Sequence, residues 1–252
     1  MASKVSLFLT PASLSGIDLS RQAVVVFDVL RATTTITAAL AAGVNPIYVF
    51  GRVDDARHEA GPPSTARILA GEQKCLAPDG FDRGNSPGGF SATTDAGRPM
   101  FMATTNGTRA LAAVAAAPLV LAGALVNAAA VADILSGARA RAGATAFHDI
   151  LLLCAGTEGQ PSMEDLLGCG AVISELAQRQ AIDLQGDLAR IALRLFAAAR
   201  ADLPATLANS QGGRNVTAAG LADDIAFAAQ LNSLQIVGQL QRNPLRIVPA
   251  WH

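Results

Sequence analysis

The sequence predicts an α/β fold, a layered α/β/α arrangement around a largely parallel or mixed sheet. Apolar, strand-like runs recur along the chain, and most of them precede a segment with helical apolar spacing. Because consecutive parallel strands need crossover connections, this alternation favours a sheet between layers of helices. No long linker or repeat divides the 252 residues, so we expect a single compact domain over residues 1–252.

Each expected strand is a short run rich in β-branched or other apolar residues. These runs are Val5–Leu9, Val24–Val29, Pro46–Phe50, Met100–Thr105, Leu119–Leu125 and Ile150–Cys154. The order of the strands in the sheet cannot be deduced from these runs.

Three segments are expected to be helical, and one is expected to be irregular. The threonines from Thr33 begin the first helix, the alanine-rich segment Leu111–Ala117 forms the second, and Glu164–Arg179 has the apolar spacing of a half-buried helix. Gly80–Gly97 contains five glycines and Pro87, a composition that favours an irregular loop.

The charge balance excludes partners that need a broad basic surface. The formal net charge is −1, from 19 Lys plus Arg and 20 Asp plus Glu. We therefore expect no nucleic acid and no membrane as partners, and a small ligand instead. Lysine occurs only at Lys4 and Lys74, and a local arginine can still bind a phosphate through two parallel hydrogen bonds.

The cysteine spacing and the apolar runs indicate the compartment. Cys75, Cys154 and Cys169 include no C-x-x-C pair, which predicts a reduced, cytoplasmic protein. The first apolar run is stopped at Thr10 and Pro11, too early for a signal peptide. No apolar run reaches the roughly 20 residues that span a bilayer as a helix.

The first polar cluster follows the run Val24–Val29. Asp28, Arg31 and Thr33 lie within a few residues of one another, between the end of a buried strand and the start of a helix. Open α/β sheets bind ligands at this end of their strands, and free N–H groups at a helix start favour an anion such as phosphate. An acid, a guanidinium and hydroxyls together suggest phosphate chemistry with a metal.

The second polar cluster is TTNGTR, residues 104–109. Asn106 and Gly107 allow a turn with positive φ, and Thr105 or Thr108 can cap the next helix while amides remain for phosphate oxygens. An ordinary Asn-Gly turn with a Thr cap explains the segment equally well.

The third polar cluster is CAGTEGQPSMED, residues 154–165. Glu158, Glu164 and Asp165 supply oxygen ligands for a hard divalent ion, while Ser162 with Asp165 also forms the S-x-x-D pattern of a capping box. Cys154 is expected to be a small buried hydrophobe, since nothing around it in the sequence stabilises a thiolate.

Between these clusters, the segment from Gly71 to Phe90 contributes Glu72, Asp82, Arg83, Asn85 and Ser86 as polar candidates. Its Asn-Ser-Pro turn has a purely conformational explanation as well, because proline restricts the residue before it.

Taken in order, these segments resemble the 2-phosphosulfolactate phosphatase family. The resemblance depends on FDVLRATTTI at 27–36, GE at 71–72, FDRGNSP at 81–87, ATTNGTRAL at 103–111 and CAGTEGQPSMEDLLGCGA at 154–171, with SQGGRNV and GLADDI near the end of the chain. It implies Mg²⁺-dependent hydrolysis of the phosphate ester of sulfolactate, in the route to coenzyme M.

Charge neutralisation and alignment are the main requirements of such a reaction. We expect Asp28 and Arg31 to be catalytic and a small anionic phosphoester to be the substrate. The expected substrate-binding residues are Thr33, Asn85, Thr105, Asn106, Gly107 and Thr108. The expected Mg²⁺ ligands are Asp28, Glu72, Glu164 and Asp165. The sulfonate needs a further cation, with Arg83, Arg109 and Arg214 as unranked candidates.

Several alternatives stay open. The nucleophile is water, Asp28 forming a phosphoaspartate, or, less favoured, Cys154. Leu30 interrupts the D-x-D signature of haloacid dehalogenases, which disfavours membership in that group. The Walker pattern is absent, which disfavours nucleotide triphosphate hydrolysis. A phosphatase of another small phosphorylated hydroxy acid and a non-catalytic anion-binding protein are the two competing functions, and homodimer formation is left open.

Overall fold

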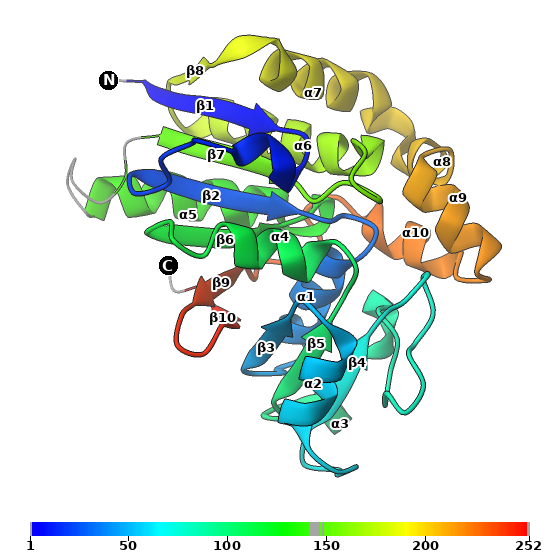
Figure 1. The fold of residues 1–252 in the computed structure, drawn as a ribbon. Coiled ribbons are helices and arrows are strands. Elements are labelled where there is room, and N and C mark those ends of the chain that lie inside the picture. The colour runs from blue at the N-terminus through cyan, green and yellow to red at the C-terminus, as the bar shows by residue number, and fades with distance from the viewer. Residues whose placement is uncertain (1, 142–146, 148, 251–252) are drawn as a thin grey trace.

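The computed structural model describes residues 2–141, 147 and 149–250 and confirms the α/β class (Figure 1). Its strands form one ten-stranded sheet in the order β4-β5-β3-β10-β9-β6-β2-β7-β1-β8. They are β1 Ser3–Phe8, β2 Gln22–Phe27, β3 Ile47–Phe50, β4 Ile68–Gly71, β5 Met100–Ala103, β6 Leu119–Gly123, β7 Asp149–Cys154, β8 Ile182–Leu184, β9 Gly238–Gln241 and β10 Arg246–Pro249.

The helices connect these strands and continue beyond β8. The α-helices are α1 Ala32–Ala41, α2 Val53–Ala60, α3 Ala92–Asp95, α4 Gly107–Ala113, α5 Ala128–Arg141, α6 Met163–Arg179, α7 Gly186–Ala199, α8 Leu203–Ala208, α9 Gln211–Ala218 and α10 Asp223–Ala228. Short 3-10 helices are η1 Pro11–Leu14, η2 Pro87–Gly89, η3 Leu125–Asn127 and η5 Arg200–Asp202.

The sheet is mixed and consists of two parallel parts. In one part β6, β2, β7, β1 and β8 are parallel neighbours, and in the other β3, β5 and β4 are. The hairpin of β9 and β10 lies between the two parts and is antiparallel to β6 on one side and to β3 on the other. The sheet is twisted, and β3, β4 and β5 run at a steep angle to β1, β2 and β7 (Figure 1).

Alternate residues of β2 show why this strand is buried on both faces. Val25 and Phe27 belong to the core that the sheet forms with α5, α6 and α7, whereas Val24 and Val26 belong to the core with α1 and α4. Successive strand side chains point to opposite faces, so an unbroken apolar run is what a sheet covered by helices on both sides requires.

The predicted strands are found, with ends shifted by a few residues. Four further strands, β4, β8, β9 and β10, were not predicted. The predicted helix Glu164–Arg179 is confirmed as α6, but the helix predicted over Leu111–Ala117 is displaced, because α4 already ends at Ala113. Gly80–Gly97 is mostly irregular, as predicted, except for the single turns η2 and α3.

In the part of the chain that the structure describes, none of the helices combines the length and the apolar composition needed to cross a membrane.

Candidate active site

The turn from β2 into α1 is built by its own polar side chains. Asp28 follows β2, and its Oδ1 accepts a hydrogen bond from the Ala32 N–H at 3.0 Å. The Thr33 hydroxyl accepts from the Asp28 N–H and donates to the Asp28 carbonyl, both at 3.0 Å. The predicted substrate ligand Thr33 therefore has its hydroxyl engaged in fixing this turn.

The Asp28 carboxyl lies in an environment that disfavours its charge. Burial raises its pKa to about 7, and the neighbouring charges of Glu72 and Glu164 act in the same direction, while the Ala32 N–H and Arg31 oppose them. No hydrogen bond reaches Asp28 Oδ2 within the described residues, so this oxygen is available to a ligand.

The TTNGTR loop packs directly against Asp28. A Cβ at Gly107 would lie 2.7 Å from Asp28 Oδ2 and 2.5 Å from the Ala32 Cβ, so only glycine allows this close approach. The prediction of a positive-φ turn at Asn106 and Gly107 is wrong: Asn106 has φ −117° and Gly107 is not among the positive-φ glycines. Thr108 bonds with Thr104 at both its hydroxyl and its N–H, which closes the loop.

Glu72 follows β4 and bridges two loops. Its Oε1 accepts from the Thr105 N–H at 2.6 Å, and its Oε2 accepts from the Cys75 N–H at 3.1 Å. The prediction that Thr105 caps the next helix is also wrong, because Asn106 is the N-cap residue and no side chain bonds there.

Arg31 is a buried cation held in one orientation from three sides. Its Nη1 donates to Asp224 Oδ2 at 2.7 Å and to Ser86 Oγ at 3.3 Å, and its Nη2 donates to the Cys75 carbonyl. Ser86 in turn donates to the same Asp224 oxygen at 2.8 Å. A guanidinium has five N–H groups, so Nε–H and one Nη2–H have no partner among the described residues.

Glu164 and Asp165 begin α6 and differ in what surrounds them. Burial raises the pKa of Glu164, whose Oε2 is buried without a hydrogen-bond partner among the described residues. Gly212 lies against it, because a Cβ there would be 2.1 Å from Glu164 Oε1. Asp165 instead accepts from the Val29 N–H at 2.9 Å and from the Gly156 N–H at 3.0 Å.

The capping-box prediction for Ser162 and Asp165 is wrong. Ser162 is the N-cap residue of α6 but makes no side-chain cap bond, since its hydroxyl pairs with the Thr157 hydroxyl at 2.8 Å. Asp165 is directed toward the strand ends, where it ties the segment after β2 to the segment after β7. Burial raises its pKa well above the usual range, and the charges nearby add to this effect.

These elements enclose a small pocket, which we call the inner pocket. It has a volume of about 60 Å³ and is lined by five of the predicted site residues, Asp28, Arg31, Glu72, Asn85 and Asn106. Asn85 Oδ1 is buried and has no hydrogen-bond partner in the described part of the chain.

Sequence reasoning missed several residues of the inner pocket and its wall. Cys75, Gly212 and Asn215 line it, and Asp224 holds Arg31 from behind together with Ser86, which the sequence did offer as a polar candidate. The signal for three of them was the pair of tail motifs SQGGRNV and GLADDI, which contain Gly212, Asn215 and Asp224.

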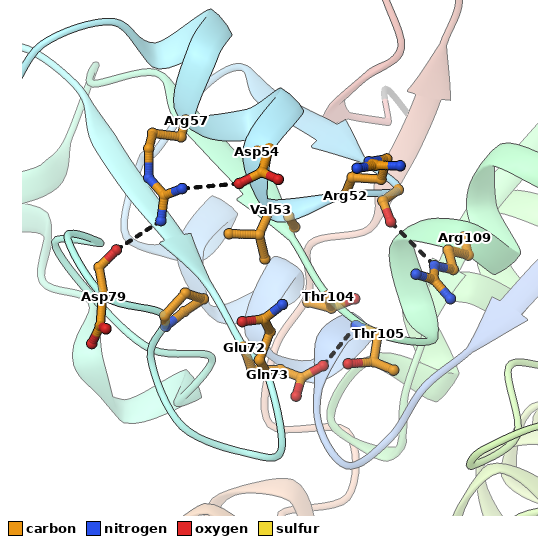
Figure 2. A pocket seen from close by; sticks show the side chains of 13 residues that line it. Arg52, Val53, Asp54, Arg57, Glu72, Gln73, Asp79, Thr104, Thr105 and Arg109 are labelled. Carbon is orange, nitrogen blue, oxygen red and sulfur yellow. Dashed lines mark hydrogen bonds and ion pairs between the residues drawn. The ribbon is translucent and has the colours of Figure 1, made fainter.

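A second, larger pocket adjoins the first, and we call it the outer pocket (Figure 2). It has a volume of about 480 Å³, and its wall includes Glu72, Thr105 and Arg109 together with Arg52 and Arg57 of the α2 region. Glu72 lines both pockets. The other predicted site residues line neither pocket: Thr33, Gly107, Thr108, Glu164 and Asp165.

Two arginines considered for the sulfonate are engaged elsewhere. Arg83 donates to both carboxylate oxygens of Asp95, at 2.7 Å and 2.6 Å, which lowers the pKa of Asp95 to about 2. Arg214 donates to the Asn209 carbonyl and to Gln211 on the exposed side of α9.

The donor chemistry fits a partly hydrated Mg²⁺. Oxygen donors on Asp28, Glu72 and Asn85 line one pocket, and the buried Asn85 oxygen lacks a partner. Among the described residues, no three His, Cys, Asp or Glu side chains form a ready-made metal cage. Mg²⁺ is commonly held by one or two carboxylates, with waters and a substrate phosphate completing its octahedron.

Cys154 lies below the pocket in the core. Its Sγ is 3.7 Å from Sγ of Cys169, and the hydrogen bond with Cys169 and burial raise its pKa well above that of a free thiol. A thiol in this environment is a poor nucleophile at neutral pH, as the sequence led us to expect.

Comparison with known proteins agrees with this site. The family described as 2-phosphosulpholactate phosphatase matches residues 8–243. A "Probable 2-phosphosulfolactate phosphatase" of Carboxydothermus hydrogenoformans is 37% identical over 247 residues, covering 97% of both chains. Proteins of the same name from Synechococcus sp. (strain JA-2-3B'a(2-13)) and Parasynechococcus marenigrum are 36% and 37% identical over 233 residues, covering 91% of this chain and 93% of theirs. The chain therefore belongs to the 2-phosphosulpholactate phosphatase family.

Proposed function

We propose that this phosphatase hydrolyses 2-phosphosulfolactate to sulfolactate and phosphate, with Mg²⁺ as its cofactor and within the route to coenzyme M. The observation that carries the proposal is the inner pocket, which is lined by the fixed guanidinium of Arg31 and by two acids, Asp28 and Glu72. Those acids repel a dianionic phosphate unless a cation neutralises them. The pocket thus fits a metal and a phosphate bound together better than either one alone.

The residues of the inner pocket have distinct roles in this proposal. Arg31 presents Nε–H and one Nη2–H to the phosphate, and a planar guanidinium suits a phosphate held by two bonds. Asp28 and Glu72 would hold the Mg²⁺, with the Asn85 oxygen as a further donor. When bound, Mg²⁺ neutralises charge that develops on the phosphoryl oxygens.

In the reaction, the bond between phosphorus and the ester oxygen breaks, and an oxygen nucleophile forms the new bond to phosphorus. The leaving alkoxide of sulfolactate takes up a proton. If water attacks, Asp28 receives its proton. If Asp28 itself attacks, the phosphoaspartate that forms is then hydrolysed by water, which releases the phosphate and regenerates the Asp28 carboxylate. Thr33, Thr108 and Asp165 support the site through the backbone bonds described above.

The decisive experiment measures phosphate release from 2-phosphosulfolactate, with Mg²⁺ and with excess chelator. We expect turnover with Mg²⁺ and loss of at least tenfold in chelator, because the acids then repel the substrate. Full turnover in chelator would refute the metal assignment. Release only from other phosphoesters would leave a phosphatase of different specificity, and binding without any release would indicate an anion-binding protein.

The cellular location is part of the proposal. Cys75, Cys154 and Cys169 are free thiols, and the buried pair Cys154 and Cys169 forms no disulfide. Unbonded cysteines are typical of a reducing compartment, which supports a cytoplasmic enzyme.

A further inference from the structure

The inner pocket is small, and the larger outer pocket lies beside it. The inner pocket measures about 60 Å³ and the outer about 480 Å³. A three-carbon acid carrying phosphate, sulfonate and carboxylate groups extends well beyond a single phosphate. The remaining groups therefore need a neighbouring space.

The two pockets are neighbours that share a lining residue. Glu72 lines both of them, and the adjacent residues Thr105 and Asn106 line the outer and the inner pocket respectively. The Thr105 N–H donates to Glu72 Oε1 at 2.6 Å. The outer pocket is therefore the neighbouring space for the groups of a substrate whose phosphate is in the inner pocket.

Unused cationic groups lie on one side of the outer pocket. Arg109 donates only its Nε–H, to the Gly51 carbonyl at 3.1 Å, and so retains both Nη groups. The Arg52 side chain forms no hydrogen bond or ion pair within the described residues. Figure 2 shows these two arginines together, on the side of the pocket where Thr104 and Thr105 lie.

Two acids of the outer pocket, Asp54 and Asp79, lie on the other side near the third arginine, whereas Glu72 lies beside Thr105. Arg57 donates to Asp54 at 3.0 Å and to the Asp79 carbonyl at 2.8 Å (Figure 2). Its guanidinium is therefore partly neutralised, and the Asp79 side chain adds negative charge nearby. An anion is thus favoured beside Arg52 and Arg109 and disfavoured beside Arg57.

We infer that Arg52 and Arg109 bind the sulfonate of the substrate and set the preference for a sulfonated over a carboxylated phosphoester. The inference rests on the proposed function. A sulfonate is a permanent anion with three oxygens in a tetrahedral arrangement, so two guanidinium groups can each donate to it. A carboxylate offers only two oxygens in one plane and would bind these arginines less completely.

The test uses the single and double variants Arg52→Ala and Arg109→Ala, with Arg194→Ala on the exposed side of α7 as a charge-matched control. Two substrates are compared: 2-phosphosulfolactate and its analogue with a carboxylate in place of the sulfonate. We expect each single variant to raise KM for the sulfonated substrate by about tenfold, with a smaller change in kcat. KM for the carboxylate analogue should rise less, so that the preference for the sulfonated substrate over the analogue becomes smaller.

A binding measurement without turnover gives an independent readout. Sulfolactate, which has no phosphate, should bind the double variant more weakly in calorimetry, while inorganic phosphate should bind it as it binds the Arg194→Ala control. Equal losses for both substrates, or unchanged sulfolactate binding, would overturn the inference. Failure of the proposed function is distinguishable, because the wild-type protein would then release no phosphate from 2-phosphosulfolactate.

Discussion

At the scale of single residues, Asp28 combines a functional position with a cost to stability. Its pKa is 3.8 in a model peptide and about 7 in the folded protein, chiefly because of burial. Between these values the folded state binds more protons than the unfolded state, so stability falls as pH rises through this window. Above pH 7 the whole penalty is present in the metal-free protein.

Asp28→Asn should therefore have opposite effects on activity and stability. Turnover should fall more than tenfold, consistent with a loss of roughly 2–4 kcal/mol of transition-state stabilisation. In chelator, the variant's Tm should exceed that of the wild type at pH 8, and the difference should shrink toward pH 4. Thermal melts across this pH range provide the check, with Asp18→Asn in an exposed loop as the control. Near-normal turnover of Asp28→Asn would show that Asp28 has a structural role and not a catalytic one.

The Arg31–Asp224 ion pair is the second feature at this scale. Both side chains are buried, with 2% and 8% of their surface exposed. Breaking a buried pair from one side leaves an uncompensated charge, which costs about 3–5 kcal/mol. Although 193 residues separate the two partners, they form one buried ion pair at the inner pocket.

Asp224→Asn should lower turnover by about one to two orders of magnitude, because Arg31 loses the charge that orients it. Inorganic phosphate should also bind more weakly, which a purely structural change far from the pocket would not cause. Asp223→Asn is the matched control, since Asp223 is the exposed neighbour on the same helix. Unchanged phosphate binding in Asp224→Asn would show that Arg31 does not depend on this partner.

At the scale of elements, α9 meets α6 at the inner pocket. Gly212 of α9 lies against Glu164 of α6, with space for no more than a hydrogen at the glycine. Through this contact α9, a helix near the end of the chain, contributes to the site whose residues Asp28 and Arg31 follow β2.

Gly212→Ala should displace the Glu164 side chain, because the added Cβ would fall 2.1 Å from its Oε1. We expect turnover to fall at least tenfold while far-UV circular dichroism stays that of the folded protein. Gly88→Ala is the control, since no atom lies within 4 Å of a Cβ there. Wild-type turnover in Gly212→Ala would mean that the position of Glu164 does not matter.

The elements also show which parts of the structure could be predicted from the sequence. The long apolar runs before Asp28, Thr104 and Cys154 identified strands and the ends that carry the site, because local composition decides them. The four-residue strands β9 and β10 escaped prediction, since short strands depend on their pairing partners. The roles of Gly107 and Asp224 escaped as well, because each is set by a residue distant in sequence.

At the scale of the whole molecule, the hairpin of β9 and β10 connects the two parallel parts of the sheet. Asp28 and Arg31 follow a strand of one part, and Glu72 and Thr105 follow strands of the other. The relative placement of the two parts therefore controls the geometry of the site.

Ile247→Ala, at a fully buried position of β10, tests this connection. The substitution should lower the free energy of unfolding by about 2–5 kcal/mol, as is usual for truncating a buried isoleucine. Ile191→Ala on α7 is the control, since Ile191 is 51% exposed and should change stability little. Urea unfolding gives both values. A loss below 1 kcal/mol for Ile247→Ala would show that the hairpin is not tightly packed.

The same hairpin has a consequence for biosynthesis. Its strands are translated after all the other strands of the sheet, yet they occupy the middle of it. Synthesis proceeds at about 5–20 residues per second, and early segments begin to fold while later ones are still being made. On the ribosome, one edge of β3 and one edge of β6 therefore stay unpaired until residues 238–249 have been synthesised. Such edges are prone to aggregation, so a nascent chain of this protein is expected to need chaperone protection for longer than a protein whose central strands come first.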